Sequence, residues 1–179
     1  KTCKIDNFGN TFLIPWRNFL GQIHSVFICH GVDTIGKCAF EYHGDLEYIF
    51  IPITVKSIQN RAFWGCGKLR SLSLPKNLTT LHSDAFAYCK SLTSIVIPDG
   101  VQSIGEEVFR YCTQLTEIFI PESVIEIVSN PFVGCKLLNS ITVDQGSKHF
   151  ISNDDVLFNR ARTRIICFLS KKSRTFTIP

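Results

Sequence analysis

The sequence lacks the short motifs that mark the common catalytic and nucleotide-binding sites. Its 179 residues contain no G-x-S-x-G, no H-E-x-x-H, no P-loop and no G-x-G-x-x-G, the patterns of serine hydrolases, zinc proteases and nucleotide-binding proteins. Two pairs of adjacent carboxylates are present, Glu106–Glu107 and Asp154–Asp155. Neighbours in sequence point apart, whereas a general acid and base must converge on one substrate. We therefore expect no catalytic residues, no cofactor and no enzymatic activity.

Methionine is also absent, and so is any apolar run long enough to cross a membrane. Without a methionine, Lys1 is not a natural start, and the last two residues, Ile178 and Pro179, match the sixth and seventh places of the repeat described below. We interpret the chain as a piece of a longer protein, so that a signal peptide or an anchor would lie outside it. The hydrophobic share of 45% is enough for one continuous core.

What the sequence does contain is a repeat of 23 residues without insertions. The unit LTSIVIPDGVQSIGEEVFRYCTQ occupies residues 92–114. Its first place is taken in successive copies by Ile23, Leu46, Leu69, Leu92, Leu115 and Leu138. A constant period of this length indicates a solenoid, in which every repeat is one coil.

The first six places of each unit predict a short strand. The fourth and sixth places are aliphatic in all six copies, as in Ile49/Ile51 and Ile118/Ile120. This alternation is typical of a strand whose fourth and sixth side chains point inward and whose third and fifth point outward. Pro follows at the seventh place in four copies and should end the strand, because it cannot donate to a ladder. We expect the strands to stack in parallel, roughly 4.8 Å apart, as one sheet.

A phenylalanine recurs on the far side of each coil. Phe40, Phe63, Phe86, Phe109 and Phe132 occupy the same place of their copies. Pro131 precedes the last of them, where the other copies carry Ala or Val, which favours a tight turn or a short 3-10 segment over a long helix. We expect these five rings to form a spine through the core.

The complete pattern, L-x-x-I-x-I-P-x-x-V-x-x-I-G-x-x-A-F-x-x-C-x-x, resembles the leucine-rich repeat of the BspA-like family over residues 23–137. Residues 138–179 are similar to a second element of that family, in which a divergent copy runs into a β-hairpin and then into a truncated further repeat. The resemblance implies a leucine-rich-repeat solenoid: a right-handed coil with one parallel β-sheet, short turns or 3-10 segments on the other side, and little α-helix. It also implies a microbial cell-surface or secreted protein that binds host or matrix proteins.

Residues 1–22 keep no clear register with the repeat and predict a degenerate capping repeat. Terminal repeats need an atypical outer face to cover the open end of the core. Phe8, Phe12, Trp16 and Phe19 would lie over that end. A ligand site built on Trp16 is the alternative.

The eight cysteines are interpreted first as packing residues. Cys66, Cys89, Cys112 and Cys135 share the twenty-first place, which His43 takes in the first copy. A cysteine repeated in this way is a small buried hydrophobe stacked on its neighbours, and no pair has the C-x-x-C spacing of zinc fingers. We expect no metal site and reduced thiols in this column. A zinc site of Cys29, His30, Cys38 and His43 is a weaker alternative, and bridges involving Cys3, Cys29, Cys38 or Cys167 are left open.

One outward surface is unusually aromatic. The fifth place reads Phe27, Phe50, Ser73, Val96, Phe119 and Thr142, and the third place adds Tyr48. Phe27 and Phe50 should be neighbours, with Tyr48 on the same face and Glu47 and Arg70 at the border. Exposed apolar patches with polar rims tend to mark binding sites. The predicted protein-binding residues are therefore Phe27, Glu47, Tyr48, Phe50, Arg70, Val96 and Phe119.

The net charge of +4 has a local origin. Arg160, Arg162, Arg164, Lys171, Lys172 and Arg174 lie together with no acidic residue between them. Such a cluster fits a polyanion, although the first three would alternate along one strand, where they equally fit a solvated edge that discourages strand pairing. We expect polyanion contact as a secondary property and no nucleic-acid partner.

Two functions fit these observations. The first is an extracellular recognition or adhesion module with a protein ligand, supported by the aromatic patch and by a possible glycosylation sequon at Asn77. The second is an intracellular, cytoplasmic scaffold or regulatory protein, supported by the cysteine column, which suits a reducing compartment.

Overall fold

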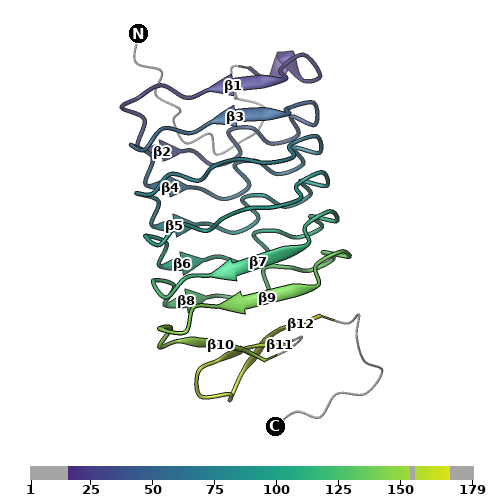
Figure 1. Cartoon of the computed structure of the whole chain (residues 1–179). Coiled ribbons are helices and arrows are strands. Elements are labelled where there is room, and N and C mark those ends of the chain that lie inside the picture. Colours follow the sequence, from purple (N-terminus) through teal and green to yellow (C-terminus); the bar gives the residue numbers. More distant parts are fainter. Residues whose placement is uncertain (1–15, 154–155, 170–179) are drawn as a thin grey trace.

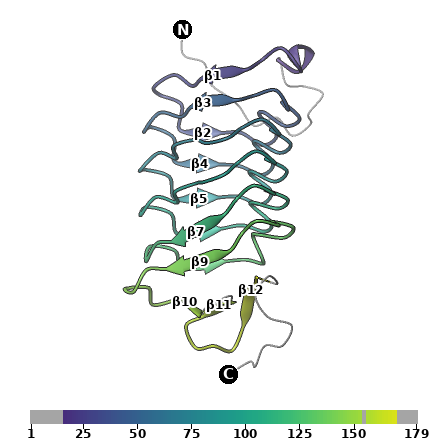
Figure 2. The same ribbon diagram turned by 45° about the vertical axis from the view of Figure 1, so that its right-hand side comes forward.

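The computed structural model describes residues 16–153 and 156–169, and in this part the chain winds into a stack of coils (Figures 1 and 2). The expected solenoid of parallel strands with almost no helix is confirmed. Within the described ranges the only helix is η2 (Arg17–Phe19), a single 3-10 turn, and no helix could span a membrane. The predictions for Cys3, Phe8, Phe12, Asp154, Asp155, Lys171, Lys172 and Arg174 fall outside the described residues.

The first column of strands lies at the third to sixth places of the repeat. It contains β1 (Ser25–Phe27), β3 (Tyr48–Phe50), β7 (Glu117–Ile120) and β9 (Ser140–Val143). β1 pairs with β3 and β7 with β9, in parallel and with partners 23 residues apart, so that Phe27 faces Phe50 as predicted. Along β7 the side chains alternate between exposed and buried, which confirms the inward and outward places. Residues 71–74 and 94–97 of the two middle coils form no strand. The former segment contains Ser71, Leu72 and Ser73, none of which is a β-branched or aromatic residue that strands favour.

The continuous sheet of the solenoid is a second column that the sequence analysis did not predict. It consists of β2 (Thr34–Ile35), β4 (Ser57–Ile58), β5 (Thr80–Leu81), β6 (Ser103–Ile104) and β8 (Glu126–Ile127), five parallel strands in consecutive order. The expectation of one parallel sheet at the first column was therefore wrong, since that column holds two separate pairs. Each short strand buries its aliphatic thirteenth-place residue, such as Ile58 or Ile104, completely.

The third side of the coil is a column of tight turns with left-handed backbone, which confirms the first of the two expected forms, a tight turn or a short 3-10 segment. Positive φ angles occur at the sixteenth place in Cys38, Arg61, Asp84 and Glu107, and at the twentieth place in Tyr42, Gly65, Tyr88, Tyr111 and Gly134. These turns aim alternate N–H groups at the next coil. The N–H of Phe40 donates to the carbonyl of Ala62 at 2.7 Å, and that of Tyr42 donates to Trp64 at 2.8 Å. The coils are thus hydrogen-bonded to one another on the turn side as well.

The predicted phenylalanine spine runs through the core. The centroids of Phe40, Phe63, Phe86, Phe109 and Phe132 are successively 5.3, 5.2, 5.9 and 5.9 Å apart, and the rings are nearly parallel. Trp16 stacks on the first ring at 5.6 Å, and its indole N–H donates to the carbonyl of Ala39. Trp16 therefore covers the end of the spine, which fits the capping interpretation.

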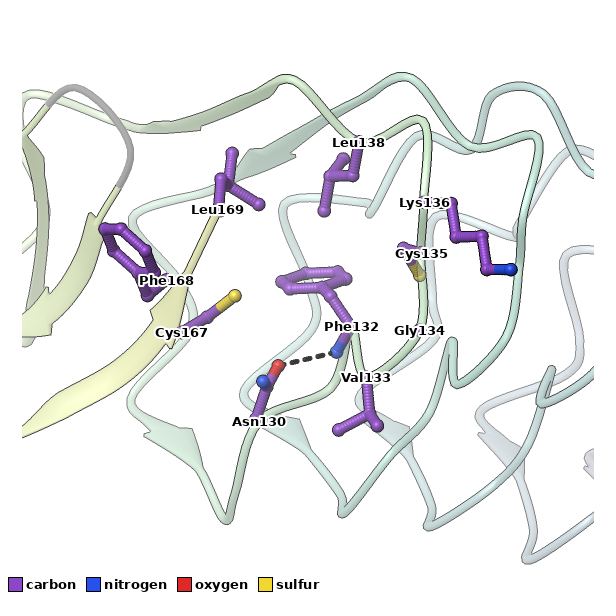
Figure 3. A pocket seen from close by; sticks show the side chains of 10 residues that line it. All are labelled: Asn130, Phe132, Val133, Gly134, Cys135, Lys136, Leu138, Cys167, Phe168 and Leu169. Atoms are coloured by element: carbon purple, nitrogen blue, oxygen red, sulfur yellow. Dashed lines mark hydrogen bonds between the residues drawn. The ribbon is translucent and has the colours of Figure 1, made fainter. Parts of the chain in front are cut away.

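An antiparallel sheet follows the last coil. It contains β10 (Phe150–Asn153), β11 (Val156–Asn159) and β12 (Ile165–Phe168). Cys167 and Leu169 lie beside the ring of Phe132, at the C-terminal end of the spine (Figure 3). The same figure shows the side-chain oxygen of Asn130 accepting a hydrogen bond from the N–H of Phe132.

The described part of the basic cluster is a turn. The prediction that Arg160, Arg162 and Arg164 alternate along a strand was wrong, because residues 160–164 connect β11 to β12 and Arg162 has a φ of 57°. Two local bonds hold this turn: Asn159 donates to the hydroxyl of Thr163 and accepts from the N–H of Arg164. The Arg164 guanidinium donates to the carbonyl of Val128, next to β8, the last strand of the second column. Its charge therefore lies next to the outer strand of the second column, where it would discourage the pairing of a further strand.

Candidate protein-binding surface

The aromatic group predicted on the first column is present at its N-terminal end. Phe27 and Phe50 are paired residues of β1 and β3, and the ring of Tyr48 lies 5.7 Å from that of Phe27. The side chains are 71% exposed for Phe27, 47% for Tyr48 and 42% for Phe50. The alternation that buries Ile49 and half-buries Val26 places these rings in solvent, so their exposure is a consequence of the register.

Charged side chains lie at one border of this aromatic group, where the chain enters the first column. Glu47 and Arg70 are exposed in the segments that lead into the first column. Lys68 and Asp45 form an ion pair nearby, and the hydrogen bond from Lys68 lowers the pKa of the Asp45 carboxyl. The result is an apolar centre with a rim of both charges, the usual anatomy of a protein interface.

The remaining predicted residues continue the same row toward the C-terminus. Val96 is 75% exposed and Phe119 is 42% exposed. Ser73 separates Phe50 from Val96 in the fifth-place column, so the structure does not join the two ends in a single aromatic patch. Between them lies a hollow formed by the two middle coils.

A second aromatic row lies on the turn side, and the sequence analysis missed it. The rings of Tyr42, Trp64, Tyr88 and Tyr111 are successively 4.6, 4.8 and 4.9 Å apart. Arg61 lies over Trp64, and Arg110 lies over Tyr88 and Tyr111. Each arginine also pairs with a carboxylate, Glu41 for Arg61 and Glu107 for Arg110. Trp64 belongs to the nineteenth place and the tyrosines to the twentieth, so no single column of the repeat showed the row.

The cysteine column is buried at Cys66, Cys89 and Cys112 and half-buried at Cys135, and all four thiols form hydrogen bonds. Each thiol donates to the carbonyl of the spine phenylalanine in the preceding coil: Cys66 to Phe40, Cys89 to Phe63, Cys112 to Phe86 and Cys135 to Phe109, at 3.0–3.3 Å. Burial raises the pKa of all four thiols, to about 12 for Cys135. A neutral thiol is a poor nucleophile and a poor metal ligand.

The alternative zinc group does not assemble. Cys29 and His30 are exposed, whereas Cys38 and His43 are buried, and Nδ1 of His43 lies 3.2 Å from the carbonyl oxygen of Glu41. Among the residues that the structure describes, no three His, Cys, Asp or Glu side chains are placed to hold a metal ion. Asn77 is exposed in the turn after the third copy's strand segment, where its use as a glycosylation site stays a prediction.

Comparison with known proteins identifies the repeat. A family model described as the BspA-type leucine-rich repeat region matches in six copies over residues 33–159. The chain is a BspA-type leucine-rich repeat protein. No curated protein matches it. The family and the similar solved structures are bacterial repeat proteins of a generally non-catalytic kind, and the BspA-type fold is suited to protein interaction.

Three solved structures place this BspA-type chain among bacterial relatives. A leucine-rich repeat protein from Eubacterium ventriosum is 25% identical with a TM-score of 0.85, over 97% of this chain and 46% of that one. A leucine-rich cell surface protein from Faecalibacterium prausnitzii is 34% identical with a TM-score of 0.68, over 75% and 36%. A leucine-rich repeat protein from T. pallidum is 30% identical with a TM-score of 0.65, over 76% and 61%. The chain thus spans less than two thirds of each relative's length.

Proposed function

We propose that this chain is the protein-recognition part of a bacterial cell-surface or secreted protein, and that a host or matrix protein docks on the first column around Phe27, Tyr48 and Phe50. The observation that carries the proposal is the exposure of three contacting or paired aromatic side chains at the surface of an otherwise well-packed solenoid. Leaving a Phe side chain in water forgoes roughly 1.5–3 kcal/mol of burial. Contact with a partner would recover this free energy.

The description of one relative supports the proposed location. The F. prausnitzii protein, 34% identical over 75% of this chain, is described as a cell surface protein. An adhesive role fits a non-catalytic repeat with aromatic and arginine residues on one face, because these residue types are the usual anchors of protein interfaces. The neutral, buried thiols of the cysteine column are inert packing groups and are compatible with an oxidising environment.

The experiment compares binding to a panel of purified extracellular-matrix glycoproteins and collagens, measured by surface plasmon resonance. The double change Tyr48→Ser with Phe50→Ser should abolish binding and leave the fold intact, because the third place already carries Ser71 and the fifth place Ser73. Ile125→Ser is the matched control, since Ile125 is 54% exposed but lies outside the first column, directly before β8.

Three results are informative. Loss of binding in the double variant alone supports the proposal. Equal binding by the double variant and the wild type would place the contact elsewhere, and the basic segment from Arg160 to Arg174 would become the next candidate. A wild-type chain that binds no member of the panel would contradict the host or matrix partner.

A further inference from the structure

The hollow on the strand side separates the two apolar ends of the fifth-place column. It has a volume of about 430 Å³ and lies between two successive coils. Its lining consists of Leu72, Ser73, Leu74 and Lys76 from one coil and Val96, Ile97, Pro98, Asp99 and Gly100 from the next. The lining spans residues 72–76 of one coil and 96–100 of the next, so the hollow, which we call the trough, runs from the strand places past the seventh-place Pro into the following turn.

Two features of the sequence create this trough. Ser73 is the smallest side chain of its column, between Phe50 in the preceding coil and Val96 in the following one. In addition, the two coils that line the trough have no assigned strand at residues 71–74 and 94–97, whereas β1, β3, β7 and β9 are paired on either side. The small side chain and the interrupted pairing coincide at the same point of the surface.

The two ends of the trough differ in chemistry. Ser73 and Val96 lie over Leu72, Leu74 and Ile97 at one end, where the surface is mostly apolar. Lys76 and Asp99 are exposed at the other end, and in the described part of the chain neither belongs to an ion pair. The carboxylate of Asp99 would repel a polyanion or an anionic lipid headgroup that approached the ammonium group of Lys76. A polypeptide, which offers apolar side chains together with donors and acceptors, complements both ends.

We infer that the trough holds an extended segment of the protein partner, with one large apolar side chain seated over Ser73 and polar groups at Lys76 and Asp99. This inference rests on the proposed function and specifies how the partner binds. An extended chain rises about 3.3 Å per residue, so about five residues cover the length of the trough. The seated side chain would contact Val96 beside Ser73 and the lining residues Leu72 and Leu74, and interface anchors are found in apolar hollows of this kind.

The test uses linear random peptides displayed on phage, selected on the purified chain. Selected peptides should share a large apolar residue, and a fluorescent copy of one should bind the wild type in an anisotropy titration. Ser73→Phe fills the trough with a ring that the same column carries at Phe27, Phe50 and Phe119, so the fold should persist. We expect it to weaken binding by about tenfold or more, which corresponds to about 1.4 kcal/mol.

Thr142→Phe is the matched control, because it adds the same ring to the same column but outside the trough. Its affinity for the peptide should stay within about twofold of the wild type, and circular dichroism should show both variants folded. Failure to select any peptide, or equal peptide affinity in Ser73→Phe and the wild type, would overturn the inference. Loss of matrix-protein binding in the Tyr48 and Phe50 double variant, with no loss in Ser73→Phe, would leave the proposed function intact and reject the trough alone.

Discussion

The thiol of Cys89 donates a hydrogen bond to the backbone carbonyl of Phe63, at 3.3 Å, in the preceding coil. The cysteine column and the phenylalanine spine are therefore one connected structure, since the same bond recurs at Cys66, Cys112 and Cys135. The bond requires the protonated thiol, and burial favours the same neutral form by raising the pKa of Cys89 well above 9.0.

The first prediction is a loss of stability at alkaline pH. The pKa of Cys89 is higher in the folded chain than in the unfolded one. The contribution of this thiol to the free energy of unfolding is therefore complete below about pH 9 and falls as the pH rises above that value. For a thiol that stays protonated in the folded state, the free energy of unfolding falls by about 1.4 kcal/mol per pH unit in this range. Urea denaturation at successive pH values should show the decline.

The control for this prediction is Cys89→Ala. The substitution lowers stability at every pH through lost packing, but its decline between pH 8 and pH 10 should be smaller than that of the wild type by about 1.4 kcal/mol. Identical slopes in the two proteins would show that Cys89 ionises normally when folded.

The second prediction is that the cysteine column stays reduced and metal-free. Side chains held parallel by a regular stack do not readily give the near-perpendicular dihedral of a disulfide. Mass spectrometry of the unreduced protein should find unlinked peptides containing Cys66, Cys89, Cys112 and Cys135, and metal analysis should find no stoichiometric zinc. A linked peptide joining residues 66 and 89, or 112 and 135, would contradict it.

The third prediction concerns the inward places of the repeat. Ile97→Asp should destabilise the chain by several kcal/mol, because Ile97 is only 2% exposed and the new carboxylate would be buried without a partner. Val96→Asp, one residue earlier but 75% exposed, should change stability by no more than about 0.5 kcal/mol. Chemical denaturation of both variants measures the contrast, and equal effects would mean that the register is wrong.

The fourth prediction concerns Gly134, which has a φ of +75°. A Cβ at this position would lie 2.6 Å from the ring of Tyr111, and a left-handed conformation costs an L-residue about 1–2 kcal/mol. Gly134→Ala should therefore lower the free energy of unfolding by at least that amount. Gly44→Ala is the control, because its Cβ would meet only ordinary contacts, the nearest at 3.8 Å. A neutral Gly134→Ala would show that Tyr111 can move aside.

The sequence was sufficient to predict the coil, the spine and the pairing of Phe27 with Phe50, because each depends only on which residues recur every 23 positions. It did not reveal the second sheet, whose strands are two residues long and too short to alternate. Nor did it reveal the left-handed turns, since residues as different as Cys38, Arg61 and Asp84 adopt the same positive φ.

The features of the surface that depend on contacts between different places were also missed. The ring of Trp64, at the nineteenth place, lies between those of Tyr42 and Tyr88, at the twentieth place. Arg164 reaches the carbonyl of Val128 across 36 residues. The residues that occupy one place in successive copies of the repeat carry no information about either contact, because each contact joins two different places.

The turn column has one more property, which comes from the direction of its hydrogen bonds. The N–H groups of Phe40, Phe63, Phe86 and Phe109 all donate toward the following coil, so their peptide dipoles add along the solenoid axis, as they do in a helix. The C-terminal end of the column therefore has a partial positive charge. The side-chain oxygen of Asn130 accepts a hydrogen bond from the N–H of Phe132 there. This end of the turn column therefore has an electrostatic preference for hydrogen-bond acceptors, and each additional coil would extend the aligned dipoles by one peptide layer.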